Sequence, residues 1–147
     1  TPPSVLLLPI QIAQKGVHHR HRDRPALPTP VYQQIRNRVV EGIARSELRP
    51  GDRLASVRTL ASAFAINPAT VSKAYELLRT EGLVVTNAKS GTAISPAPAA
   101  DRHSTAHWEE RLRILLAEAL AHGRTEQSIL DSAARCLDTL SPVGRRP

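Results

Sequence analysis

The sequence LASVRTLASAFAINPATVSKAY, at residues 54–75, decides the fold. Its apolar residues recur at helical spacing in two short segments with a tight turn between them. At the start of the second segment, Asn67 can accept a hydrogen bond from an unpaired backbone N–H, and Pro68 fills the first helical position, where no donor is needed. Ile66 can pack on Val71 as a hydrophobic staple. These signals fix the start of the second helix and predict a helix-turn-helix.

The first helix of this pair has one apolar stripe. Ser56 is placed to cap the helix, and Arg58 lies off the stripe, where we expect it to face DNA. The stripe consists of Leu54, Val57, Leu60, Ala61 and Phe64. We expect it to be buried against the second helix.

The second helix opens with a small, polar first turn that carries Asn67, Thr70 and Ser72. A helix that enters the major groove contacts bases mainly with its N-terminal residues. A rigid polar first turn is therefore what a DNA-reading helix requires.

Another helix is expected before this pair. Thr29 is its expected cap and Pro30 its first residue, and the helix is expected to run to about Ser46. Its arginines are Arg36, Arg38 and Arg45, for which a solvated face is the simplest interpretation. Only some of them could reach phosphates, without base specificity, and they are assigned no specific role. Its buried face is predicted to consist of Val31, Ile35, Val39 and Ile43.

A hairpin is expected after the pair. The turn at residues 49–52 leads into the first helix of the pair, and Gly82 ends the second because it tolerates positive φ. The β-prone runs 83–86 and 92–94 flank residues 87–91 and predict a hairpin wing. Three helices followed by such a hairpin make a winged helix-turn-helix, which we place at residues 29–95, with its wing tip beside the DNA backbone or minor groove.

Composition favours a small basic protein. The chain has 147 residues, 41% hydrophobic and only 3% aromatic content, and a formal net charge of +7. These values suit small helices better than a large enzyme core, and the charge favours a polyanionic partner. Basic residues exceed acidic ones by three in residues 1–28 and by four in 29–95, whereas the two balance in 96–147. This division is expected if the last part meets protein rather than nucleic acid.

Residues 1–28 are predicted to be a disordered basic arm, because prolines interrupt any helical or strand period. His18, His19 and His21 lack thiolate or carboxylate partners at ligand spacing, so we favour a DNA-attracting arm and expect no metal site and no cofactor. The apolar run 5–12 is too short to span a bilayer and lacks the features of a signal peptide. A soluble protein is therefore expected. Cys136 is the single cysteine, so a reducing cytoplasm is the expected compartment, and we favour a small apolar filler over a redox sensor.

Residues 96–104 are predicted to be a stiff, proline-containing linker to a helical hairpin at 105–141, and residues 142–147 a disordered tail. We expect Thr105 and Thr125 to cap the two helices and Gly123 to follow the first. Two such helices cannot bury both apolar faces against each other, so we expect a homodimer; packing on the winged domain is the alternative. The residues expected in the dimer interface are Trp108, Leu112, Leu115, Leu116, Leu120, Ile129, Leu130 and Leu137.

The chain resembles the GntR family of bacterial transcription regulators over residues 30–95. The motifs that carry the resemblance include LRPGDRL at 48–54, NPATVSKAY at 67–75 and EGL at 81–83. The recognition helix and the short two-helix tail resemble the YtrA-like subfamily, which implies a tail that dimerises and no large ligand domain. The fold implied is mainly α with a small β-hairpin.

The resemblance also implies roles for individual residues. Arg58 would contact the operator, Gly91 would belong to the wing, and Asn67, Thr70, Ser72 and Lys73 would lie on the recognition helix. Arginine suits guanine, asparagine suits adenine and lysine suits a phosphate. Tyr75 is expected to place its ring in the core and its hydroxyl at the DNA backbone. The candidate DNA-binding residues are Ser56, Arg58, Asn67, Thr70, Ser72, Lys73, Tyr75, Lys89 and Gly91.

Three positions depart from the family pattern. Ala55 replaces a usual proline, the run 87–89 replaces Arg-Arg-Gly, and Ala93 replaces a common phenylalanine. The wing is therefore less basic than the family pattern, and Lys89 and the N-terminal arm are expected to supply part of the missing attraction.

We expect a homodimeric repressor that binds a palindromic operator in double-stranded DNA at the nucleoid. Nonspecific DNA binding or protein association by the winged helix is the alternative. An enzyme is disfavoured: residues 107–109 resemble the His-x-Glu of a deaminase, but the paired cysteines that hold zinc are absent from the sequence. The effector, if any, is not indicated by the sequence.

Overall fold

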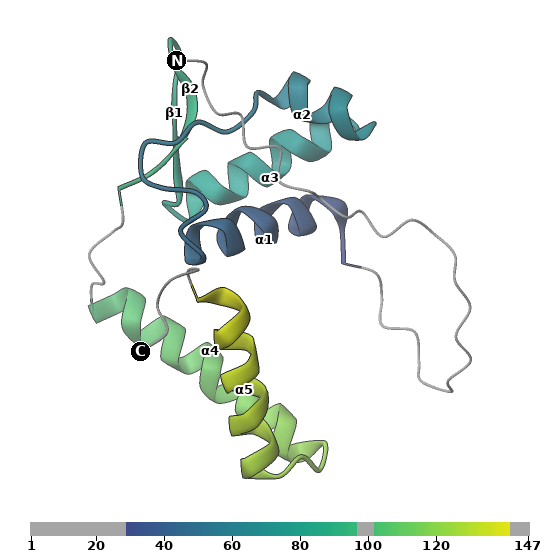
Figure 1. The fold of residues 1–147 in the computed structure, drawn as a ribbon, viewed down its shortest axis with the longest axis vertical. Helices are drawn as coiled ribbons and strands as arrows, with labels where there is room; N and C mark the ends of the chain where they lie inside the picture. Colours follow the sequence, from purple (N-terminus) through teal and green to yellow (C-terminus); the bar gives the residue numbers. More distant parts are fainter. Residues whose placement is uncertain (1–28, 97–101, 142–147) are drawn as a thin grey trace. The chain divides into compact units, whose positions relative to one another are not determined.

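A computed structural model describes residues 29–96 and 102–141, which belong to two compact units divided after Ala97. The first unit contains three helices and an antiparallel hairpin, and the second contains two helices (Figure 1). The predicted basic arm with its histidines, the C-terminal tail and residues 97–101 of the predicted linker lie outside the described residues. The elements of the first unit are α1 (Val31–Ala44), α2 (Val57–Phe64), α3 (Pro68–Thr80), β1 (Val84–Asn87) and β2 (Gly91–Ile94).

The core of the first unit lies where α1, α2, α3 and the hairpin meet. Helix α3 contacts α1, α2 and β1 and is the central element. The buried apolar residues are Ile35, Val39, Leu48, Ala55, Leu60, Ala61, Val71, Ala74, Tyr75, Leu78, Val84 and Ile94. The apolar faces predicted for the first two helices are confirmed, since their remaining members pack against this cluster.

Both helix caps of the helix-turn-helix are confirmed. The Ser56 hydroxyl oxygen accepts a 3.1 Å hydrogen bond from the Thr59 amide at the start of α2. The Asn67 side-chain oxygen accepts a 2.9 Å bond from the Ala69 amide, and Pro68 occupies the first turn of α3. These bonds satisfy amides that the helices themselves leave unpaired.

The start and end of α1 differ from the prediction. Thr29 does not cap this helix: Pro30 occupies the N-cap with an extended ψ of 145°, makes no side-chain cap bond, and accepts from two amides through its carbonyl. The physical reason is that proline tolerates the extended cap conformation as well as the first helical position. The helix ends at Ala44, because Ser46 adopts a left-handed conformation with φ 60°.

The turn between α2 and α3 passes through Ala65, which has left-handed dihedrals of φ 52° and ψ 44°. Helix α3 ends at Thr80, and Gly82, two residues later, has φ 74°, as the glycine signal predicts. The Leu83 amide donates back to the Leu78 carbonyl. These two turns set the directions in which α3 begins and the hairpin departs.

The hairpin pairs β1 with β2 from Val84↔Ile94 to Asn87↔Gly91. The segment before α2 adds to the free edge of β2, through an isolated bridge between Arg53 and Ala93. The Leu54 amide donates to the Thr92 carbonyl at 2.9 Å. The wing is therefore attached to the loop that leads into α2 as well as to α3.

The second unit consists of α4 (Arg102–Ala121) and α5 (Glu126–Leu140). Thr125 caps α5 through a 3.1 Å bond from the Ser128 amide, and Gly123 has φ 82°, both as predicted. The expected cap at Thr105 is wrong, because this residue lies inside α4 and residues 102–104 are helical rather than linker. No glycine or proline in residues 102–104 opposes helical dihedrals, so the helix extends beyond the expected cap.

Candidate nucleic-acid interface

Helix α3 has a buried face and an exposed polar face. Val71, Ala74, Tyr75 and Leu78 are buried. The exposed face carries Ala69, Ser72, Lys73, Glu76 and Thr80, and Thr70 is half-buried beside it. The first turn of this face is small enough for a close approach to the edges of base pairs.

Asn67 is exposed at the start of this face, but its side-chain oxygen already serves as the helix cap. Its amide nitrogen has no hydrogen-bond partner among the described residues. Because recognition of adenine by an amide uses both a donor and an acceptor, a base contact here would have the cap oxygen accept a second bond.

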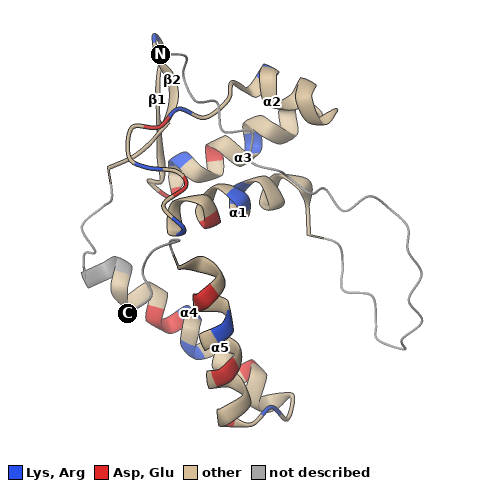
Figure 2. Cartoon of the chain, in the orientation of Figure 1, with Lys and Arg blue, Asp and Glu red and all other residues tan. Residues whose placement is uncertain are grey.

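Arg58 lies in the first turn of α2, off the apolar stripe, and is exposed as predicted. Four other arginines of the unit form ion pairs: Arg36 with Glu81, Arg38 and Arg45 with Glu41, and Arg79 with Glu76. Within residues 29–96, the side chains of Arg49, Arg53, Arg58 and Lys89 make no ion pair or hydrogen bond with another described residue. All four residues are exposed: Arg49 and Arg53 lie in the loop before α2, Arg58 lies on α2, and Lys89 lies in the turn between β1 and β2. Lys and Arg occur on all three helices of this unit (Figure 2).

The wing tip is the turn between β1 and β2. The Lys89 amide donates to the Asn87 side-chain oxygen at 2.9 Å, and Gly91 has φ 80°. The asparagine bond and the glycine conformation shape the turn, while the Lys89 side chain is exposed. Lys89 is therefore the cationic group available at this tip.

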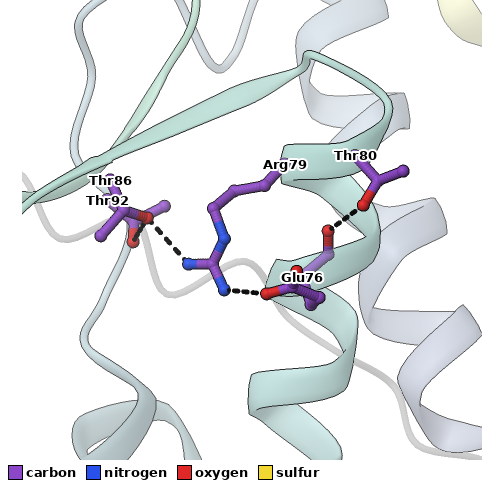
Figure 3. A network of polar contacts seen from close by, with 5 residues as sticks. All are labelled: Glu76, Arg79, Thr80, Thr86 and Thr92. Carbon is purple, nitrogen blue, oxygen red and sulfur yellow. Dashed lines mark hydrogen bonds and ion pairs between the residues drawn. The ribbon is translucent and has the colours of Figure 1, made fainter.

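A polar network connects α3 to the wing (Figure 3). One Arg79 nitrogen lies 2.6 Å from a Glu76 carboxylate oxygen, and another donates to the Thr86 hydroxyl at 2.9 Å. The Thr86 and Thr92 hydroxyls are 3.0 Å apart across the hairpin. Arg79 thus pairs with the carboxylate on the exposed face of α3 and bonds to β1 directly, while β2 joins the network through the contact between Thr86 and Thr92.

The Lys73 side chain contacts an aromatic ring on α1. Its ammonium nitrogen lies 4.0 Å from the ring centroid of Tyr32, which is within the range of a cation–π contact. This contact joins the first turn of α1 to the second turn of α3.

Tyr75 does not belong to the exposed surface, which corrects its assignment as a DNA-binding residue. The side chain is buried, and its hydroxyl donates to the Ala55 carbonyl at 2.6 Å. The core position of α3 that Tyr75 occupies directs the hydroxyl into the protein. Burial raises the pKa of Tyr75 to about 12.

The other candidate DNA-binding residues are all at least partly accessible and lie on or beside α2, α3 and the wing. They are Ser56, Arg58, Asn67, Thr70, Ser72, Lys73, Lys89 and Gly91. Two further exposed residues were not among the predicted candidates: Ala69, on the exposed face of α3, and Arg53, whose backbone bridges to the wing. The helical period of α3 would have found Ala69. The contact of Tyr32 with Lys73 and that of Arg79 with the wing were not predicted either, because the sequence carries no local signal for them.

In the described part of the chain, no group of His, Cys, Asp and Glu side chains is arranged to hold a metal ion. None of the helices there is both long enough and apolar enough to cross a membrane. Cys136 lies on α5 and is exposed.

Comparison with known proteins places this geometry among regulators. Residues 31–94 match the family model described as bacterial regulatory proteins, gntR family. The HTH-type transcriptional repressor YtrA of Bacillus subtilis is 45% identical over 71 residues, which are 48% of this chain and 55% of the repressor. The chain therefore spans about half the length of the curated relatives it matches.

Two solved structures share the fold. YtrA from Sulfolobus acidocaldarius, a GntR-family transcription factor, is 39% identical, with a TM-score of 0.52 over 63% of this chain and 88% of that one. A transcriptional antiterminator from Listeria monocytogenes has a TM-score of 0.72 over 83% of this chain and 93% of that one. At 24% identity, the second similarity concerns the fold alone.

Proposed function

The chain belongs to the GntR family of DNA-binding transcription regulators, and we propose that it is a repressor that binds a palindromic operator as a homodimer. The observation that carries the proposal is the exposed first turn of α3, whose position is fixed by the Asn67 cap. Each recognition helix reads one half-site in the major groove, and the wing lies along the adjacent DNA.

Roles in DNA binding follow from chemistry and accessibility. Arg58 is exposed and unpaired among the described residues, and its planar group suits the two acceptors of guanine. Asn67 and Ser72 face the bases from the start of α3, with Thr70 beside them. Lys73 and Lys89 bind phosphates, and Ser56 and Gly91 shape the backbone near the DNA. Ala69 suits a thymine methyl group, which an apolar side chain contacts in the major groove.

The second unit provides the dimer interface. Its described helices leave eight large apolar side chains exposed, whereas all the buried apolar residues among those that the structure describes lie between residues 35 and 94. The exposed side chains are Trp108, Leu112, Ile114, Leu115, Leu116, Leu120, Leu130 and Leu137. Ile129 is half-buried, and Ile114 was not among the predicted interface residues. An apolar surface of this kind marks an interaction site, and a second copy offers a complementary face by symmetry.

A repressor acts where the chromosome lies, so we propose that it works in the cytoplasm at the nucleoid. Its operator is expected to be two half-sites about one helical turn apart, because a symmetric dimer presents its recognition helices at that spacing. We assign no effector.

Selection of bound fragments from a random DNA pool tests the proposal. We expect the selected sequences to contain an inverted repeat. Arg58→Ala should weaken binding to the selected sequence by about 1–3 kcal/mol and relax its base preference, whereas Lys73→Ala should weaken all sequences similarly. Arg38→Ala is a matched control, because it removes an equal charge from an ion-paired position on α1. A pool that yields no preferred sequence would instead indicate nonspecific DNA binding.

A further inference from the structure

The recognition helix has one cationic side chain in its first two turns, Lys73, and that side chain is held by an aromatic ring from another helix. The ammonium nitrogen lies 4.0 Å from the centroid of the Tyr32 ring. Tyr32 is half-buried at the start of α1 and packs against the core, so the position of the ring is fixed by the fold.

An exposed lysine ordinarily samples many rotamers, and ordering it on a phosphate costs conformational entropy. Contact with a fixed ring restricts those rotamers before DNA arrives. The ring face attracts the cation without carrying an opposite net charge. An ammonium held this way therefore keeps its attraction for a polyanion.

The ion-paired cations of the same unit provide the contrast. Arg36 lies 3.0 Å from Glu81, and Arg79 lies 2.6 Å from Glu76, so a carboxylate offsets each of these charges. Lys73 has no ion pair with a described residue. Among the cationic side chains of residues 29–96 that contact another described side chain, Lys73 is held by a ring, whereas the four arginines are held by carboxylates.

We propose that Tyr32 is a positioning residue that holds the Lys73 ammonium ready for a DNA phosphate. This inference rests on the proposed DNA contact of Lys73. It assigns to α1 a part in DNA binding that requires no contact between α1 and the DNA. The tyrosine hydroxyl has no role in it, because the ring face provides the attraction.

A double-mutant cycle on the whole protein tests the inference. The variants are Tyr32→Leu, Tyr32→Phe and Lys73→Ala, and the readout is affinity for a duplex carrying the selected sequence, measured over a series of salt concentrations. We expect Tyr32→Leu to weaken binding about two- to fivefold when Lys73 is present and to have almost no effect in the Lys73→Ala background. Tyr32→Phe should retain the affinity, because it keeps the ring.

The salt dependence and a second background separate positioning from a general loss of structure. Lys73→Ala should reduce the slope of log affinity against log salt by about one, whereas Tyr32→Leu should leave it unchanged because the charge remains. In an Arg58→Ala background, Tyr32→Leu should weaken affinity for the selected duplex as much as it does in the unaltered protein. Equal losses with and without Lys73, or a loss with Tyr32→Phe, would overturn the inference.

Failure of the inference is distinguishable from failure of the proposed function. If the unaltered protein does not prefer the selected duplex to one of unrelated sequence, the proposed function fails. If the preference is intact and Lys73→Ala leaves affinity unchanged, the inference alone is overturned.

Discussion

The hydroxyl of Tyr75 donates a 2.6 Å hydrogen bond to the backbone carbonyl of Ala55. Tyr75 lies in the middle of α3, and Ala55 immediately precedes the residue that caps α2. Both residues are buried. The bond therefore connects the recognition helix to the loop that leads into α2, the helix that carries Arg58.

Removing this hydroxyl should destabilise the protein. We expect Tyr75→Phe to lower the free energy of unfolding by about 1–2 kcal/mol, because the Ala55 carbonyl is left buried without its partner. Urea unfolding followed by circular dichroism measures the change. Thr80→Val serves as a control, because it removes an exposed hydroxyl from the same helix and should cost less. A Tyr75→Phe variant as stable as the unaltered protein would contradict the role of this bond.

Tyr75 should also make the free energy of unfolding depend on pH above about pH 10. Burial raises the pKa of Tyr75 from 10.0 to about 12, so the folded state holds the phenol proton more tightly than the unfolded state does. Its stabilising contribution is fully present below pH 10 and is lost as the pH rises from 10 toward 12, by about 2–3 kcal/mol in total. The stability advantage over Tyr75→Phe should therefore stay constant between pH 7 and 9, shrink as the pH rises above 10, and reverse by about pH 12. A constant difference up to pH 12 would be inconsistent with the raised pKa.

A substitution at Ala65, in the turn between α2 and α3, should stabilise the protein. Ala65 is exposed and has left-handed dihedrals, which cost an L-residue about 1–2 kcal/mol and cost glycine little. We expect Ala65→Gly to raise the free energy of unfolding by up to about 1 kcal/mol after the greater flexibility of glycine in the unfolded chain is counted. Ala63→Gly, at an exposed position inside α2, should instead lower it by about 0.5–1 kcal/mol. Effects of the same sign at both positions would contradict the strain at Ala65.

The network around Arg79 should restrain the wing. Arg79→Met removes the bonds to Glu76 and Thr86 while keeping much of the side-chain length. We expect faster amide hydrogen exchange in residues 84–94, because the hairpin loses its polar attachment to α3. Arg38→Met is the matched control, since its ion pair lies within α1 and should leave exchange in the hairpin unchanged. Unchanged exchange in Arg79→Met would show that the strand pairing and the core hold the wing without this network.

The features that could be predicted from the sequence depend on neighbours within one helical turn. Ser56 and Asn67 cap helices through amides two or three residues away, and Gly82 ends α3 through bonds to the preceding turn. The apolar periods of α1 and α2 predicted their buried faces for the same reason. Of the expected caps, Thr29 and Thr105 were wrong, because a threonine that suits a cap does not by itself stop a helix from starting elsewhere.

The remaining features depend on contacts between distant residues. The bond from Tyr75 to Ala55 spans 20 positions, and the Tyr32–Lys73 contact joins two different helices. Neither contact follows from a sequence period. The Tyr75 ring was correctly expected in the core, but its hydroxyl was wrongly expected at the DNA backbone, and no contact was predicted between Tyr32 and Lys73. The left-handed Ala65 lacks the glycine that would have indicated its conformation.

The dimer predicted from the second unit can be tested by placing one charge on α4, either among its exposed apolar side chains or away from them. Leu115→Glu puts a carboxylate among the exposed apolar side chains and should shift the protein to a monomer, because burying an unpaired charge in an interface is costly. Ala106→Glu adds the same charge to an exposed position of α4 whose neighbours at helical spacing, Glu109 and Glu110, are already charged, and this variant should remain dimeric. Sedimentation equilibrium at micromolar concentration measures both. If the unaltered protein is a monomer, the proposed homodimer is wrong; if Leu115→Glu stays dimeric, the interface lies elsewhere.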